Sequence, residues 1–164
     1  MKIANDIFIP ELARLLAEEK EVQFTPSGVS MRPFIEGDKD SVVLAAYTRE
    51  PRRGDIVLAQ VRTTGERVIY VLHRIVRIER KDSDGQTMAE PVYILQGDGN
   101  LSGFELCRRD QIIGRVIRIE NPEGKRKRLV SGLFSRGLLW IALRPFRPLL
   151  LKLYRHTFLK WNYK

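Results

Sequence analysis

The chain has 164 residues, of which 43% are apolar and 30% are charged, and its formal net charge is +9. This composition excludes a collagen-like chain and a disordered tail, and the length allows about 70% of the extended surface to be buried around a core. One cysteine and two histidines argue against a disulfide, a thiolate zinc site or a histidine-rich metal site, so we expect one domain without metal or cofactor.

The first twenty residues do not have the pattern of a secretory signal. Charged side chains interrupt the stretch where a continuous apolar segment would have to lie, namely Asp6, Glu11 and Arg14. From Pro10 onward the leucines follow helical spacing, and proline suits the first turn of a helix. We therefore assign residues 1–20 to an N-terminal segment and predict a short amphipathic helix over residues 10–20 that packs on the body of the protein.

Residues 21–120 have the pattern of a β domain. Short apolar or alternating runs are each bounded by turn residues, which predicts about six strands. These runs are Val22 to Phe24, Ser41 to Tyr47, Asp55 to Arg62, Arg67 to Glu79, Val92 to Gln96 and Gly114 to Glu120. Residues 63–66 predict a hairpin loop, and residues 81–90 predict an exposed loop. Because there is no room for crossover helices between the runs, the expected fold class is mainly β (α+β) with an antiparallel sheet.

Beyond Asn121 the chain becomes a basic tail, residues 121–164. Residues 1–120 contain 18 Lys and Arg against 19 Asp and Glu, whereas the tail contains 11 against one. A nucleic-acid-binding domain usually spreads its positive charge over a folded face. A near-neutral body with a basic appendage therefore argues against nucleic acid as the partner.

Two helices are predicted in this tail, after a linker-like basic run at residues 122–128. They cover residues 132–143 and 148–162, and the first is broken by Arg136 and falls short of the roughly 20 apolar residues that span a bilayer. The second helix places apolar side chains on one side and basic side chains opposite: Leu150, Leu151, Leu153, Tyr154, Phe158 and Trp161 against Lys152, Arg155, His156 and Lys160. Such a tail either lies on an anionic membrane surface through residues 125–164 or packs back on the β domain.

Three short segments of the β domain carry residues suited to catalysis. Small residues surround Ser30, so the backbone can approach a substrate carbonyl and point N–H groups at a developing oxyanion. A serine hydroxyl needs an adjacent base to take its proton, and His73 is the only histidine in the β domain. Asp98 and Glu105 are the two carboxylates that could fix the tautomer of this imidazole.

Each segment also has a structural interpretation. A serine in a Gly/Ser-rich turn commonly caps the turn that follows, and a lone histidine in a strand is commonly a hydrogen-bonded structural residue. The sequence Gly97-Asp98-Gly99-Asn100 is typical of a turn that needs positive φ. The order serine, histidine, acid is compatible with a triad, although triads occur in several orders on unrelated folds. It is the joint occurrence of the segments that favours catalysis.

Five motifs in chain order resemble those of the signal peptidase I and LexA-like serine peptidase superfamily. They are Ser30-Met31-Arg32-Pro33 with Gly37-Asp38, Gly54-Asp55-Ile56-Val57, His73-Arg74-Ile75, Gly97-Asp98-Gly99-Asn100 and Ile112-Ile113-Gly114-Arg115. Together they cover about residues 24–119. The histidine followed by arginine, where other members have a catalytic lysine, is similar to the serine–histidine branch of the superfamily.

This resemblance implies a coiled antiparallel β domain and a serine endopeptidase that cleaves a peptide or protein precursor. It implies that Ser30 is the nucleophile and that His73 is the general base. The acid of this branch usually lies several residues after the Gly-Asp turn, where this chain has Glu105, so Glu105 and Asp98 are both candidates to orient His73.

The resemblance also implies an oxyanion hole and a substrate-binding surface near the nucleophile, formed by Gly28, Met31 and Pro33. Many bacterial signal peptidases have a serine two residues before the nucleophile. Gly28 has no hydroxyl to offer at that position, so the hole would rest on backbone N–H groups, including that of Ser30.

Two other functions remain open at this stage. One is a catalytically silent relative that binds peptides in the same cleft and docks on a membrane through its tail. The other is a self-cleaving regulator, for which the N-terminal 23 residues leave little room for a scissile bond and a DNA-reading module. The lack of a signal sequence and the Lys/Arg cluster predict a cytoplasmic protein, peripheral on the inner face of the membrane. Precursor processing in the family favours the opposite face.

Overall fold

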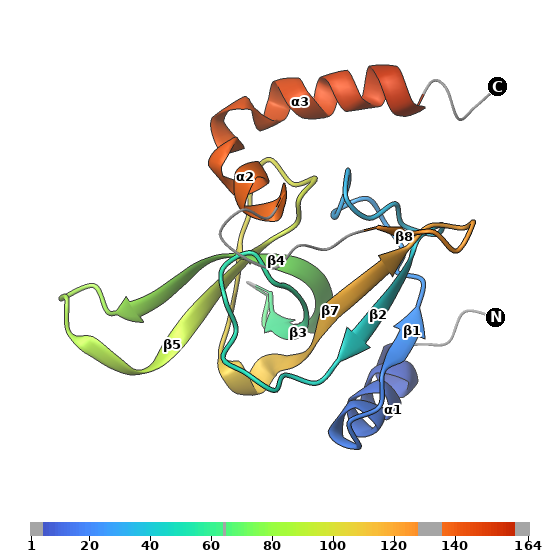
Figure 1. The fold of residues 1–164 in the computed structure, drawn as a ribbon. Helices are drawn as coiled ribbons and strands as arrows, with labels where there is room; N and C mark the ends of the chain where they lie inside the picture. The colour runs from blue at the N-terminus through green and yellow to red at the C-terminus, as the bar shows by residue number, and fades with distance from the viewer. Residues whose placement is uncertain (1–4, 64, 128–135, 160–164) are drawn as a thin grey trace.

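The computed structural model describes residues 5–63, 65–127 and 136–159. Within these residues eight strands form one sheet in which every pairing is antiparallel (Figure 1). The strands are β1 Val22–Phe24, β2 Ser41–Ala45, β3 Ile56–Arg62, β4 Val68–Lys81, β5 Thr87–Gln96, β6 Glu105–Cys107, β7 Ile112–Glu120 and β8 Arg126–Lys127. The predicted fold class, mainly β with a few helices, is confirmed.

The strand order places β4 in the interior of the sheet. The order is β1-β2-β7-β3-β4-β5-β6, with β8 paired to β7. Figure 1 shows β4 and β5 continuing beyond the other strands as a long two-stranded arm. Because β4 is paired on both edges, its residues near the centre of the sheet are held by the backbone of β3 and of β5.

Alternating side chains of β3 belong to two hydrophobic clusters, one on each face of the sheet. Ile56 and Leu58 join a cluster that also contains residues of the N-terminal segment and of the turn after β1. Val57, Ala59 and Val61 join a second cluster on the other face with residues of β5 and β6. Successive side chains of a strand point to opposite faces, so one apolar strand supports both clusters.

The N-terminal helix, α1 (Asn5–Ala17), packs on the β domain as predicted, but its bounds differ. The predicted helix began at Pro10, whereas the observed helix begins at least five residues earlier and contains Pro10. A proline inside a helix removes one backbone hydrogen bond. The burial of Ile9, Leu12 and Leu16 in the first cluster offsets that loss.

The predicted strands match the observed ones at the centre of the sheet and differ at its edges. The exposed loop predicted at residues 81–90 is shorter, because β5 begins at Thr87 and the arm stays paired. β7 begins at Ile112, two residues earlier than predicted. The short strands β6 and β8 were not predicted, and β8 lies in the segment that was expected to be a linker.

The tail forms two short helices in the described residues, α2 and α3. They are α2 Arg136–Ala142 and α3 Arg147–Tyr154, with a 3₁₀ turn at Arg144–Phe146 between them and a π-helical turn at Arg155–Leu159 after them. Parts of the two predicted helices, residues 132–135 and 160–162, lie outside the described residues. None of the helices in the described part of the chain is long and apolar enough to cross a bilayer.

The predicted apolar side of the second helix is wrong in part. Leu151 and Arg147 are both buried, whereas Leu153 is exposed although it was placed on the same side as Leu151. Arg147 sets this orientation, because its guanidinium donates to the side chain of Gln96 and to the backbone of Asn100. The tail thus packs back on the β domain and still leaves part of its apolar surface in solvent.

Candidate active site

Ser30 lies in a tight turn that follows β1. The turn closes where the N–H of Asp38 donates to the carbonyl oxygen of Pro26 at 2.8 Å. Gly28 has φ +90°, and a Cβ at Gly37 would lie 1.9 Å from the carbonyl oxygen of Gly28. Glycine at position 28 suits the positive φ, and glycine at position 37 lets the two ends of the turn approach each other more closely than a side chain would allow.

The backbone around Ser30 has N–H groups that are available to an incoming group. Among the residues that the structure describes, no backbone carbonyl accepts a hydrogen bond from the N–H of Ser30 or of Met31. Donors of this kind next to a hydroxyl are what an oxyanion hole requires.

His73 lies on β4, opposite Val57 of β3. Its side chain is only 7% exposed, and its Nδ1 lies 2.9 Å from Oε2 of Glu105. An ionised carboxylate can only accept a hydrogen bond, so with Glu105 ionised the N–H at Nδ1 of His73 donates a hydrogen bond to Oε2 of Glu105. This leaves Nε2 as the nitrogen that can accept a proton.

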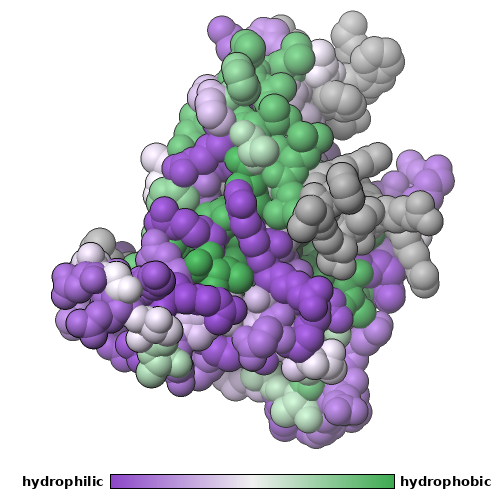
Figure 2. All heavy atoms as spheres, turned by 60° about the vertical axis from the view of Figure 1, so that its left-hand side comes forward, coloured by the Kyte–Doolittle hydropathy of each residue, from purple (hydrophilic) through white to green (hydrophobic). Residues whose placement is uncertain are grey.

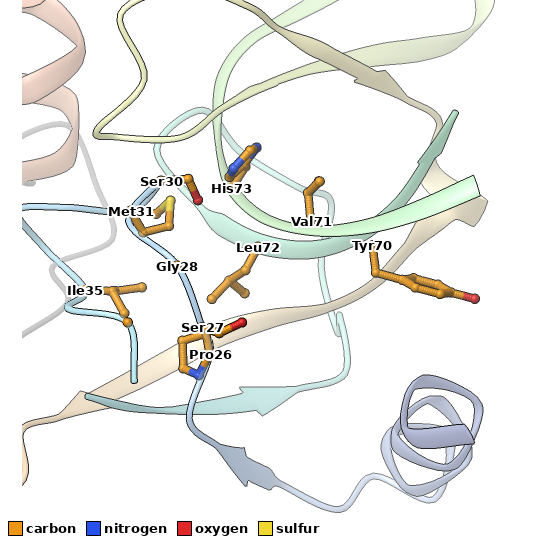
Figure 3. Close-up of a pocket in the computed structure, with 11 residues that line it drawn as sticks. Pro26, Ser27, Gly28, Ser30, Met31, Ile35, Tyr70, Val71, Leu72 and His73 are labelled. Atoms are coloured by element: carbon orange, nitrogen blue, oxygen red, sulfur yellow. The ribbon is translucent and has the colours of Figure 1, made fainter. Parts of the chain in front are cut away.

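Ser30 and His73 line the same pocket, which has a volume of about 150 Å³. Figure 3 shows the Ser30 hydroxyl and the His73 ring at one end of this pocket, and Pro26 and Ser27 at the other. Ile35 also lines it, and Figure 3 shows its side chain on the same side of the pocket as Met31. The pocket thus combines a hydroxyl and an imidazole with apolar walls.

Of the two candidate carboxylates, the structure brings Glu105 to His73. Glu105 is the first residue of β6, is paired in register with Leu95 of β5, and has a side chain that is 25% exposed. β6 is a strand of three residues at the edge of the sheet. Its pairing to β5 holds the carboxylate beside the imidazole of β4.

Asp98 does not orient His73, so this alternative is corrected. Both of its carboxylate oxygens accept hydrogen bonds from the guanidinium of Arg74, from Nε at 2.8 Å and from Nη2 at 2.7 Å. The two side chains are 1% and 3% exposed. A third hydrogen bond joins Arg74 to the carbonyl oxygen of Gly54 at 2.8 Å. Asp98 is therefore half of a buried ion pair beside the pocket.

The predicted substrate-binding residues divide between the pocket and its support. Gly28 and Met31 line the pocket, but Pro33 does not and lies half-buried in the turn behind it. Sequence reasoning did not find Tyr70 and Leu72, which also line the pocket. Their position on the strand that carries His73 is the signal that could have identified them.

Trp140 and Arg147 of the tail were also missed, although both lie close to this site. Trp140 packs its ring edge to face against Phe34 at 5.7 Å, and Arg147 lies over the ring of Trp140. Burial lowers the pKa of the Arg147 guanidinium, and the nearby Asp98 carboxylate opposes this effect. The sequence had placed this part of the chain in a separate tail, with no reason to bring it to the site.

The arrangement as a whole has the parts of a nucleophilic site. It contains a hydroxyl, an imidazole, and a carboxylate within hydrogen-bond distance of Nδ1 of that imidazole. These are the roles that a serine–histidine–acid triad requires. Comparison of the chain with protein-family models, with curated proteins and with solved structures found no match to it.

Proposed function

We propose that the chain is a serine endopeptidase of the signal peptidase and LexA-like type, with Ser30 as nucleophile, His73 as general base and Glu105 as the acid. The observation that carries the proposal is that one imidazole is held by a carboxylate at Nδ1 and lines a pocket together with a serine in a glycine-rich turn. The mainly antiparallel β domain and the order of the five motifs also support it.

In this mechanism the hydroxyl oxygen of Ser30 attacks the scissile carbonyl carbon, and its proton passes to Nε2 of His73. The carbonyl oxygen becomes an oxyanion, and the candidates to stabilise it are the N–H groups of Ser30 and Met31, which donate to no backbone carbonyl among the described residues. When the C–N bond breaks, His73 gives the proton to the leaving amine. Water then attacks the acyl ester and gives a proton to His73, and this proton returns to Ser30 as the carboxylic acid product leaves.

Glu105 supports each of these proton transfers without reacting itself. Its hydrogen bond keeps the proton of the neutral imidazole on Nδ1, and its charge stabilises the imidazolium that forms when Nε2 accepts the proton of Ser30.

The test of this function compares protein N termini across the proteome of the native strain and of a strain that carries Ser30→Ala. We expect a set of N termini to be lost in the variant, with the uncleaved precursors in their place. Ser83→Ala, in the exposed turn at the end of the β4–β5 arm, is the control and leaves the N termini unchanged.

Identical N termini in the Ser30→Ala strain would contradict the proposal and favour a catalytically silent, peptide-binding relative. A self-cleaving regulator predicts a third result. In that case the purified wild-type chain loses mass on incubation and the Ser30→Ala chain does not.

A second candidate function, docking on an anionic membrane surface, is favoured by the outer face of α3. Phe146, Leu149 and Leu153 recur at helical spacing and are 61%, 67% and 59% exposed. Figure 2 shows hydrophobic side chains gathered over the upper part of the molecule, where α2 and α3 lie. Lys152 is exposed beside them, and the sequence contains no Asp or Glu after Glu123.

We propose that this outer face of α3, formed by Phe146, Leu149, Leu153 and Lys152, inserts its apolar side chains between anionic lipid headgroups. An interfacial helix binds through buried apolar area together with the attraction of its cations to the lipid, and each cation near the surface contributes about 1 kcal/mol. The function is compatible with the endopeptidase, because the pocket and this face involve different residues.

We expect Leu149→Ser to weaken co-sedimentation of the full chain with phosphatidylglycerol vesicles by about tenfold, because burying a leucine side chain contributes roughly 1.5–3 kcal/mol. Val68→Ser is the control, since Val68 is an exposed apolar residue at the start of β4. Binding of the wild type falls as salt is raised. Equal binding to neutral phosphatidylcholine vesicles, or self-association of the chain without vesicle binding, would contradict membrane docking.

A further inference from the structure

The loop between β5 and β6 comprises residues 97–104, and its residues 97–103 lie directly against the turn that carries Ser30. The N–H of Gly99 donates to the carbonyl oxygen of Ser30 at 2.7 Å. A Cβ at Gly97 would lie 2.5 Å from the same oxygen, and a Cβ at Gly99 would lie 2.8 Å from the carbonyl oxygen of Val29. The loop and the turn are therefore in backbone contact, with no space for a side chain between them.

The same loop is held from its other side by the C-terminal helices. The indole N–H of Trp140, on α2, donates to the carbonyl oxygen of Asp98 at 2.9 Å. Nη1 of Arg147, on α3, donates to the carbonyl oxygen of Asn100 at 3.2 Å and to Oε1 of Gln96 at 3.0 Å. Three consecutive residues of the loop thus make these backbone hydrogen bonds. Asp98 bonds to Trp140, Gly99 to Ser30, and Asn100 to Arg147.

The contacts of Trp140 and Arg147 with the loop place polar groups in a buried environment, where apolar side chains would need no hydrogen-bond partners. Arg147 is 2% exposed, and its Nε has no hydrogen-bond partner among the described residues. Burial of a charged guanidinium is costly even when it is hydrogen-bonded. What the guanidinium and the indole provide in return is directional contact with particular carbonyl groups of the loop.

The loop is also the connection that leads into Glu105. Its residues follow β5 and end at the start of β6, where Glu105 accepts the hydrogen bond of His73. One segment therefore contacts the backbone of the proposed nucleophile at one point and carries the proposed acid at its end. A displacement of this segment would move both groups relative to His73.

We propose that Trp140 and Arg147 are positioning residues, which hold the loop at residues 97–103 so that Ser30 and Glu105 keep their places on either side of His73. This inference rests on the proposed endopeptidase function and deepens it, because it makes the C-terminal helices part of the catalytic unit. A misplacement of about 1 Å at a reacting group can lower a rate by about 10²-fold.

The test measures how fast an alkyl fluorophosphonate modifies Ser30 in the full-length chain. In this reaction the serine oxygen displaces fluoride from phosphorus and the serine proton passes to His73, so no peptide substrate is needed. We expect Trp140→Phe and Arg147→Met each to lower the maximal rate of modification by about tenfold or more, with the half-saturating probe concentration changed by less than about twofold.

Two matched variants and a second readout separate positioning from general destabilisation. Leu139→Ala, on the exposed side of α2, and Arg155→Met, in the exposed turn after α3, leave the rate unchanged. Amide hydrogen exchange at Gly99, whose N–H is bonded to Ser30, is faster in Trp140→Phe and in Arg147→Met than in the wild type. Thermal unfolding shows which variants are folded, and either of the two positioning variants is sufficient for the test.

The results distinguish failure of the inference from failure of the proposed function. If Ser30 of the wild type is modified no faster than Ser83, the endopeptidase proposal fails and the positioning role fails with it. If the wild type reacts at Ser30 and both folded variants react equally fast, or if Leu139→Ala slows the reaction as much as they do, the inference alone is overturned.

Discussion

Ser30→Ala, His73→Ala and the double variant are expected to lower the cleavage rate to the same residual level, about 10⁴-fold or more below the wild type. The reason is that the two side chains act as one unit. Without the imidazole the hydroxyl keeps its proton and is a poor nucleophile, and without the hydroxyl the imidazole has no proton to accept. In such units single removals cost about as much as combined removal.

The measurement is kcat/KM on a peptide that spans a cleavage site found by the comparison of N termini. Ser83→Ala and His156→Ala are the matched controls, because both residues are exposed and lie outside the pocket. If instead the fold-reduction in kcat/KM of the double variant equalled the product of the two single fold-reductions, the two residues would act separately. That result would remove the triad mechanism.

The expectation that Ser30 and His73 lie together came from the joint occurrence of the motifs in chain order, because each segment alone is compatible with a structural role. The turn at Ser30 is rich in small residues, and His73 lies in a long run with strand periodicity. A central strand of this kind pairs on both sides, which brings its middle to the interior of the sheet. The pairing of β4 with β3 and β5 then determines where the imidazole lies.

The choice between Asp98 and Glu105 could not be made from spacing, since both follow β5 within a few residues. The structure makes the choice through strand geometry. Neighbouring side chains of a strand point to opposite faces, so His73 and Arg74 of β4 point away from each other. Asp98 meets Arg74 on one face, and Glu105 meets His73 on the other.

Sequence reasoning missed the strands that are too short to show alternating polarity, and it missed the features that depend on a contact with a residue far away along the chain. β6 and β8 contain three and two residues, whereas recognition of a strand by alternating polarity needs about four residues or more. The outer part of the β4–β5 arm is exposed and polar, so it resembles a loop although its backbone is paired. The orientation of α3 depends on the contact between Arg147 and Gln96, and helical spacing carries no information on a partner 51 residues away.

Asp98 pairs with Arg74 and Glu105 pairs with His73, so we expect substitution of Asp98 to have a large effect on stability. Asp98→Asn should lower the free energy of unfolding by about 3–5 kcal/mol, because it leaves the charge of Arg74 buried without a counter-ion. Asp84→Asn, in the exposed turn of the β4–β5 arm, is the control and should change stability by less than about 0.5 kcal/mol. The measurement is the midpoint of urea unfolding, with the slope of the transition unchanged.

Glu105→Gln should do the reverse, leaving stability nearly unchanged and lowering kcat by about 10²-fold, because the amide keeps the volume of the side chain but loses the charge that stabilises the imidazolium. The exposure of this carboxylate limits the loss of stability, since water can reach the group that is left without a partner. If Asp98→Asn instead lowered kcat at unchanged stability while Glu105→Gln was fully active, the contact between His73 and Glu105 would have no catalytic role. The acid of the site would then have to be Asp98, acting through a change in the position of Arg74.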